Sequence, residues 1–335
     1  MTQKQVLNKL LANKQGVVPI SFWHHFSAAS GIDLDGYQHP EIMTDNVAKT
    51  KKFVEQVHPD FVKLMSDGLF NYAFNQPIDH PTSIYDGIVP IPDNHPWLTE
   101  TAKLVAGQKK VIGDRLGFYN VFSPVTLLKW ALSKGPDGKH NKKTANKLLA
   151  DAIISDRPKV TQALAVITQD VIKQATVAID AGADGIYYST QAIQDDRLDH
   201  HDFQELVEKY DRQIIRAVNQ LSDTNILHIC GNGGARNPLV WFKNYENAVI
   251  NWSTDVEDIS LQTGKQLFKG KVVLGGLGNT TKDVLYQGSR LAITAAIQKI
   301  ITEAGTDNVI IGANCTVPRD IDIKHLQWAV QATDF

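Results

Sequence analysis

The feature that most restricts the fold of this chain is a regular alternation of short apolar runs with longer segments of helical periodicity. Runs rich in β-branched and aromatic residues lie at 17–23, 61–65, 111–118, 185–190, 225–230, 248–254, 272–278 and 309–315. Between them, apolar residues recur every three or four positions, which predicts helices, at 41–58, 157–181, 203–221, 256–268, 281–303 and 321–333. Eight strands, each followed by a helix, predict an α/β protein with a (β/α)8 TIM barrel, although a doubly wound open sheet gives a similar pattern.

The chain is predicted to be one domain over residues 1–335, because no repeat or low-complexity segment divides it. The polar stretch 66–97 contains five prolines, and we expect it to form a long excursion over the mouth of the barrel after the second strand. The spacing in 203–221 also predicts a buried helix face, formed by Leu206, Tyr210, Ile214, Val218 and Leu221.

Composition excludes several classes of partner. The formal net charge is -2, so electrostatics gives no reason to expect a nucleic acid or a membrane surface. No apolar segment has the length of a signal peptide core or of a membrane span. The chain has only two cysteines, and without an export signal they are expected to be free thiols in a cytoplasmic protein rather than a disulfide.

In a barrel of this kind the active site lies at the C-terminal ends of the strands, and two of the predicted strands end in metal-binding residues. His228 and Cys230 are two positions apart in one strand, so their side chains face the same way. Cys315 ends the last strand, which faces the fifth across the narrow lumen. One imidazole and two thiolates are three of the four ligands of a catalytic zinc site. The alternatives are two small buried hydrophobic residues or a nucleophilic Cys–His pair.

Two carboxylates are candidate catalytic residues. Asp67 follows Lys63 by four positions along a strand, so the two side chains share a face, either to orient a substrate or as a structural ion pair. Asp255 ends the sixth strand beside His228 and Cys230. It could be a displaceable fourth zinc ligand or a hydrogen-bond partner of His228, or it could cap the following helix.

Other polar residues at strand ends are candidates for substrate contact. His24 and His25 end the first strand, where only one can point inward, and Tyr187 and Tyr188 present the same choice in the fourth strand. Asn279 lies in the glycine-rich end of the seventh strand, which does not match a phosphate-binding spacing. Arg319 follows Cys315 and could meet an anionic tail or form a surface salt bridge.

At these residues the chain resembles a known family. "ILHICGN" followed by "GANCTVP" is similar to the His-x-Cys…Cys signature of methylcobamide:coenzyme M methyltransferases, which belong to the uroporphyrinogen decarboxylase superfamily and share its (β/α)8 barrel. The resemblance covers nearly the whole chain and includes "FVKLMSDG", "FSPVTLLKWAL", "GADGIYYST", "GGLGNT" and "CTVPRDIDIKHLQWAV".

The resemblance implies a zinc ion held by His228, Cys230 and Cys315, whose open position binds a small-molecule thiol. Zinc lowers the pKa of that thiol, and the thiolate attacks a methyl group. The family's methyl donor is a methylcobamide carried by a separate corrinoid protein, so such a partner is implied here. The superfamily's decarboxylases dimerise, which makes a homodimer the expected assembly.

Two alternative functions stay open at this point. The superfamily's decarboxylases carry an arginine-rich N-terminal motif, whereas the matching stretch here is "SFWHHFSAAS", which contains no arginine. Asp67 does match their active-site aspartate, so a decarboxylase that uses Asp67 without a metal is one alternative. The other is a barrel that binds a tetrapyrrole or corrinoid without catalysis.

Overall fold

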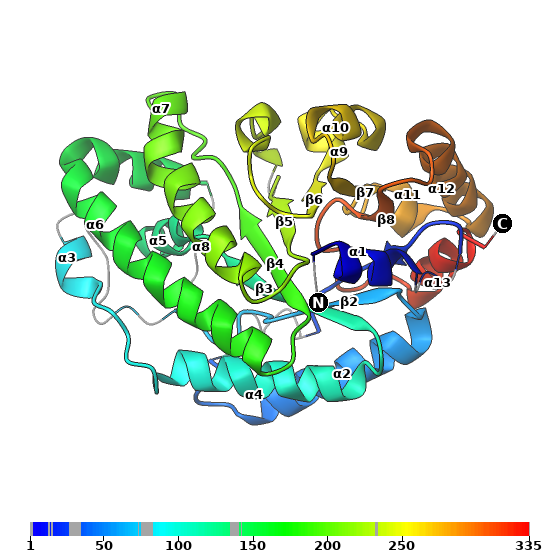
Figure 1. Ribbon diagram of the computed structural model, residues 1–335, viewed down its shortest axis with the longest axis horizontal. Coiled ribbons are helices and arrows are strands. Elements are labelled where there is room, and N and C mark those ends of the chain that lie inside the picture. Colours follow the sequence, from blue (N-terminus) through cyan, green and yellow to red (C-terminus); the bar gives the residue numbers. More distant parts are fainter. Residues whose placement is uncertain are drawn as a thin grey trace.

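A computed structural model describes residues 3–12, 14, 16–26, 35–72, 74, 83–134, 141, 143–231 and 234–334. Within them, eight parallel strands form one sheet in the order β1-β8-β7-β6-β5-β4-β3-β2. The strands are β1 (Ile20–Ser21), β2 (Phe61–Leu64), β3 (Leu116–Phe122), β4 (Gly185–Thr190), β5 (Ile226–Ile229), β6 (Val249–Trp252), β7 (Val272–Leu277) and β8 (Val309–Ala313). This order, with helices packed outside, confirms the predicted (β/α)8 barrel (Figure 1).

The barrel closes differently at β1 and β2 than elsewhere. β1 pairs with β8 and β2 pairs with β3, while Asp60 bridges the junction between β1 and β2. Its Oδ2 accepts from the Ile20 amide at 2.8 Å and its own amide donates to Ile20 O at 3.0 Å. The Ser21 hydroxyl adds a bond to Phe61 O at 2.7 Å. We call these contacts of Ile20, Ser21, Asp60 and Phe61 the β1–β2 seam.

A ring of helices surrounds the sheet, and neighbouring helices in the ring pack on one another (Figure 1). The larger ones are α2 (Glu41–Val57), α4 (Pro96–Val111), α5 (Pro124–Leu132), α6 (Ala145–Asp180), α8 (Lys209–Asn219), α10 (Leu261–Leu267), α12 (Arg290–Ala304) and α13 (Ile323–Gln331). The N-terminal helix is α1 (Gln3–Ala12), and shorter pieces are α3 (Ile84–Gly87), α7 (His200–Phe203), α9 (Thr254–Glu257) and α11 (Val284–Gln287). No helix of the described chain is long and apolar enough to cross a bilayer.

Three sequence predictions need correction here. The third strand spans 116–122 and not 111–118, because Val111 ends α4 and Gly113, at φ 66°, makes the turn that precedes the strand. The connection after β5 contains, in its described part, a 3-10 helix (η5, Leu239–Phe242) in place of an α-helix. Leu221 is 45% exposed, because α8 ends at Asn219 and the side chain lies in the following turn.

The predicted helix 157–181 is the second half of a longer element. α6 is interrupted at Asp156, whose φ of -155° and ψ of 75° are not helical, and Pro158 follows. The Asp156 carboxylate accepts from the Lys159 amide at 3.1 Å, as an N-cap does. The predicted start of the helix at residue 157 therefore coincides with the break in α6, where a second helix begins. The segment 203–221 likewise holds the last residue of α7, a π-helical turn (η3, Gln204–Glu208) and α8.

The long excursion after β2 is present, and its described part packs against α4 and α6. Tyr72 donates to Asp170 of α6 at 2.7 Å and stacks edge-on against Trp97 of α4. The Ile91 amide donates to the same carboxylate at 3.2 Å, and Lys173 forms an ion pair with Asp93. Residues 73 and 75–82 lie outside the described residues.

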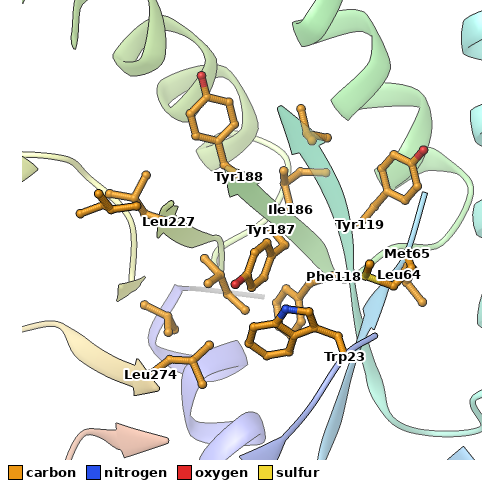
Figure 2. Packing of buried hydrophobic residues seen from close by; sticks show 14 of the residues in the cluster. Trp23, Leu64, Met65, Phe118, Tyr119, Ile186, Tyr187, Tyr188, Leu227 and Leu274 are labelled. Carbon is orange, nitrogen blue, oxygen red and sulfur yellow. The ribbon is translucent and has the colours of Figure 1, made fainter. Parts of the chain in front are cut away.

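The side chains of β4 show how the strands divide the core into two layers. Tyr187 points into the barrel toward Trp23, with ring centroids 5.2 Å apart, and Tyr188 leaves the strand on the opposite side (Figure 2). Both rings are fully buried. Large side chains therefore fill the barrel interior and the layer between the strands and the helices.

Candidate metal centre

The three predicted metal ligands converge at the C-terminal ends of β5 and β8. Cys230 directly follows β5, where its amide donates to Thr190 O at 2.8 Å, and Cys315 follows β8 by two positions. Candidate ligand atoms of His228, Cys230 and Cys315 all lie within 4.8 Å of one another. Both cysteines are free in the structure and half-buried.

The geometry of these three residues fits a tetrahedral zinc ion. His228 Nε2 lies 3.5 Å from Cys315 Sγ. Typical Zn–N and Zn–S bonds of about 2.0 and 2.3 Å at a tetrahedral angle place the two atoms roughly 3.5 Å apart. Contact with Cys230 and the nearby His228 and Lys63 lower the pKa of the Cys315 thiol well below its usual value, against the effect of burial. A lower pKa makes it easier for the thiol to lose its proton, as it must to bind a metal.

His228 is held by a buried asparagine that the sequence analysis did not single out. His228 and Asn251 are paired in register on β5 and β6, so their side chains share a face, and His228 Nδ1 bonds to Asn251 Oδ1. The Asn251 Nδ2 group donates to Leu274 O at 2.8 Å. This residue fills the role for which we considered Asp255. An asparagine in an apolar strand has no sequence signature that would have revealed it.

Lys63 of β2 enters the same interior space. Its Nζ lies 3.9 Å from the centre of the Tyr187 ring and 5.4 Å from that of Trp23, as in a cation–π contact. Burial lowers the pKa of Lys63 to about 8, while Cys315, Cys230 and Asp67 act in the opposite direction. The ammonium group is thus an inward-facing charge close to the two thiols, as the strand alternation predicted.

A second buried lysine near the thiols was not predicted. Lys129 lies on α5, donates to Asn146 Oδ1 at 3.2 Å and is only 4% exposed. Burial lowers its pKa to about 8, and the charge of Cys230 partly offsets that effect. One lysine on an apolar helix carries no signal that distinguishes it from surface lysines, so the sequence could not have revealed it.

Asp67 is buried beyond the end of β2 and is fully engaged by hydrogen bonds. Its carboxylate accepts from His25 Nδ1 at 3.0 Å and from the Phe26 amide and Asn46 Nδ2 at 2.9 Å each. The residue adopts φ 51°, a left-handed conformation that is uncommon for residues other than glycine. Asp67 lies beyond Leu64, the last residue of β2, so strand alternation does not determine where its side chain points. The predicted strand face shared with Lys63 is therefore not what brings Asp67 to the site.

The two histidines at the end of β1 behave differently. His25 faces Asp67 and keeps 35% of its side chain exposed, while His24 packs against Phe26 and Phe53. Burial lowers the pKa of His24. Burial lowers the pKa of Arg319, and the nearby Asp67 carboxylate opposes that effect. His25, Asp67 and Arg319 thus lie together at the mouth.

Asp255 and Asn279 lie at the rim, where each bonds to the segment that carries Cys315. Asp255 Oδ2 accepts from Asn314 Nδ2 at 2.6 Å, and Asn279 Nδ2 donates to Thr316 O at 3.2 Å. Asp255 sits within α9, whose N-cap is Ser253, so the capping alternative is wrong. In the described residues, the metal-binding group consists of His228, Cys230 and Cys315 and does not include Asp255.

Tyr188 does not belong to the site. Its hydroxyl donates to Asp211 of α8 at 2.6 Å, in the layer between β4 and the helices. Strand alternation sends Tyr187 inward and Tyr188 outward, so Tyr188 is wrong as a candidate for substrate contact. Tyr187 faces the interior, where its hydroxyl donates to Asn251 Oδ1 at 2.7 Å.

The fold and this site define a class: a (β/α)8 barrel with a His–Cys–Cys centre at the C-terminal ends of its strands. Residues 83–334 match the family model described as Uroporphyrinogen decarboxylase (URO-D). The chain therefore belongs to the uroporphyrinogen decarboxylase family. No curated protein sequence matches it.

Solved structures share the fold at low sequence identity. A methyltransferase from Methanosarcina mazei is similar over 99% of this chain and 98% of its own, with a TM-score of 0.68 and 16% identity. A putative vitamin-B12-independent methionine synthase from Listeria monocytogenes is similar over 93% of this chain and 96% of its own, with a TM-score of 0.57 and 15% identity. A B12-independent methionine synthase from a Shewanella species covers 96% and 95%, with a TM-score of 0.54 and 14% identity.

Proposed function

We propose that this protein is a zinc-dependent methyltransferase that moves a methyl group from a methylated corrinoid, carried by a partner protein, to a small-molecule thiol. The observation that carries the proposal is the convergence of His228 with the chain's only two cysteines. The methyltransferase among the structural neighbours and the family match support an enzyme of this general kind.

The chain's own residues are suited to bind and orient a thiol at this place. His228, Cys230 and Cys315 would hold a zinc ion, whose Lewis acidity would lower the pKa of a thiol bound beside them. The ammonium group of Lys63, directed inward over Tyr187, favours the negatively charged form of that thiol. His25 and Arg319, beside Asp67 at the mouth, are proposed to contact the rest of the substrate.

The first test is the metal content of the purified, reduced protein. We expect about one zinc per chain, retained in His39→Gln, which changes an exposed histidine, and lost in Cys230→Ser and Cys315→Ser. A wild-type protein without zinc, even after reconstitution under reducing conditions, would overturn the metal-dependent proposal.

The second test is the reaction. Zinc-loaded protein is mixed with methylcobalamin and a series of thiols, and demethylation of the corrinoid is followed by absorbance. We expect thiol-dependent demethylation that Cys230→Ser abolishes. Zinc binding without demethylation by any thiol would contradict the proposed corrinoid donor but not the metal site. This outcome is of interest because two structural neighbours are named as B12-independent.

A decarboxylase reaction centred on Asp67 is the second candidate, because the matched family is named for that activity. The bonds from His25, Phe26 and Asn46 occupy this carboxylate and support a positioning role instead. Activity on a porphyrinogen that depends on Asp67 but not on Cys230 would favour the decarboxylase.

A further inference from the structure

Four strands, β4, β5, β7 and β8, direct hydrogen-bonding groups at one side chain of β6 inside the barrel. Asn251 of β6 accepts from Tyr187 of β4 and bonds to His228 of β5 through Oδ1. Its Nδ2 donates to Leu274 O of β7 at 2.8 Å and reaches Ala313 O of β8 at 3.5 Å. The residue is fully buried, so water does not compete for these bonds.

This arrangement determines which way the amide is turned. The partners of Nδ2 are main-chain carbonyl oxygens, which can only accept, so the NH2 group must face β7 and β8. The carbonyl Oδ1 therefore faces His228 and Tyr187. An amide oxygen is only an acceptor, so the ring nitrogen that meets it must carry a proton.

We infer that Asn251 is a positioning residue that fixes His228 in the tautomer with a proton on Nδ1, so that Nε2 presents its lone pair to the metal. This inference rests on the proposed metal site and extends it to a residue on a neighbouring strand. His228 Nε2 is the nitrogen that lies 3.5 Å from Cys315 Sγ. The imidazole is thus oriented before any metal arrives.

Because the partner of His228 is a neutral amide and not a carboxylate, it affects the charge at the metal centre differently. A carboxylate partner makes the histidine a more basic ligand and adds negative charge to a centre that already holds two thiolates. The amide orients the ring without adding charge. A metal held here therefore keeps more of its ability to attract a third thiolate.

The tautomer can be measured directly in the wild-type protein without metal. Long-range proton–nitrogen correlation spectra of the reduced apoprotein distinguish a protonated from an unprotonated ring nitrogen, and His228→Gln assigns the signals. We expect Nδ1 protonated and Nε2 unprotonated. A proton on Nε2, or an exchanging mixture of tautomers, would overturn the inference, whether or not the protein transfers methyl groups.

Zinc affinity provides the second readout. Asn251→Leu, of similar volume, should weaken zinc binding by roughly 10- to 100-fold and alter the visible spectrum of the cobalt-substituted protein. Asn251→Asp keeps an acceptor for His228 Nδ1 but places a second oxygen against Leu274 O in place of the donor, so it should recover only part of the affinity. Asn120→Leu changes another buried strand asparagine, one that is bonded to Ser189, and should leave zinc binding unchanged.

These outcomes separate the inference from the proposed function. Zinc affinity in Asn251→Leu equal to that of the wild type would refute the positioning role and leave the metal site standing. A wild-type protein that binds no zinc would refute the proposed function, while the spectra of the apoprotein would still decide the tautomer.

Discussion

Asp67 illustrates how one side chain can hold the mouth of the barrel together. Replacing it by alanine leaves the Phe26 amide and the Asn46 side chain without their acceptor, and each unsatisfied buried donor costs about 1–3 kcal/mol. We expect Asp67→Ala to lower the free energy of unfolding by about 2–4 kcal/mol with zinc stoichiometry unchanged. Urea denaturation measures the first and elemental analysis the second.

The control is Asp67→Asn, since asparagine tolerates the left-handed backbone at this position and keeps one acceptor. It should lose less stability than the alanine variant. An Asp67→Ala protein as stable as the wild type would show that the carboxylate is not structural, and the decarboxylase alternative would gain weight.

We expect the buried charge of Lys63 to lower the stability of the folded protein. Burial lowers the pKa of Lys63 to about 8, so the folded protein holds the lysine proton less tightly than the unfolded chain does. At any pH where the unfolded chain carries this proton, folding is therefore disfavoured. Lys63→Met should raise the free energy of unfolding of the metal-free protein at pH 7 by roughly 1–3 kcal/mol. Urea denaturation of the variant and of Lys243→Met, an exposed-lysine control, tests this.

The pH dependence of this gain has a definite sign. Below pH 8 the lysine is charged in both states, so the full penalty applies and the gain from Lys63→Met is greatest. Above pH 8 the lysine of the folded protein has lost its proton, and the penalty falls as pH rises. It reaches zero at about 10.4, the unperturbed pKa of lysine. A gain that grew with pH over this range would contradict the buried-charge explanation.

Individual site residues differed in how well the sequence could predict them. His228, Cys230 and Cys315 were predictable because cysteine is so rare in this chain that two of them at strand ends stand out. Asn251 and Lys129 were not, because their roles come from neighbours on other elements. The choice between Tyr187 and Tyr188 stayed open because a pair of tyrosines in a strand does not reveal which one faces inward.

Among the elements, strands buried on both faces were the easiest to predict. β8, with the sequence VIIGA, is a continuous apolar run whose residues are all buried, as expected for a parallel strand covered by helices. The third strand was misplaced because the apolar end of α4 merges with the start of β3 across a short turn, and hydrophobicity alone does not separate them. The fifth connection departs from the pattern because an irregular segment and η5 cover that part of the sheet.

The contact between β4 and α8 contains a carboxyl group whose ionisation should affect stability. Asp211 accepts bonds from Tyr188, Thr190 and Tyr245, yet burial raises its pKa to about 7. The folded state therefore binds this proton more tightly than the unfolded state, and stability falls as pH rises from about 4 to 7. Above pH 7 the loss is complete.

Asp211→Asn removes this ionisation while keeping the side-chain shape. Relative to the wild type, the variant should gain stability as pH rises from 5 to 8, by about 3 kcal/mol in all. Urea midpoints of both proteins at several pH values provide the difference. A constant difference between pH 5 and 8 would show that Asp211 does not titrate in this range.

At the scale of the whole molecule, a metal at this site would connect β5 to β8. Because the ligands come together only when these strands are assembled, a metal that binds the folded chain stabilises it by mass action. Zinc at 100 times its dissociation constant should add about 2.7 kcal/mol. The melting temperature should rise with zinc, fall with a chelator, and not respond to zinc in Cys315→Ser.

The β1–β2 seam implies that the two halves of the barrel differ in rigidity. The arc from β4 to β8 is joined by continuous ladders and by the bonds of Asn251. In the described residues β1 and β2 share no ladder and are joined through Asp60 and Ser21 and, beyond the strand ends, through Asp67. A substitution at Asp60 would therefore leave Ser21 and Asp67 to hold β1 against β2, without breaking any strand ladder.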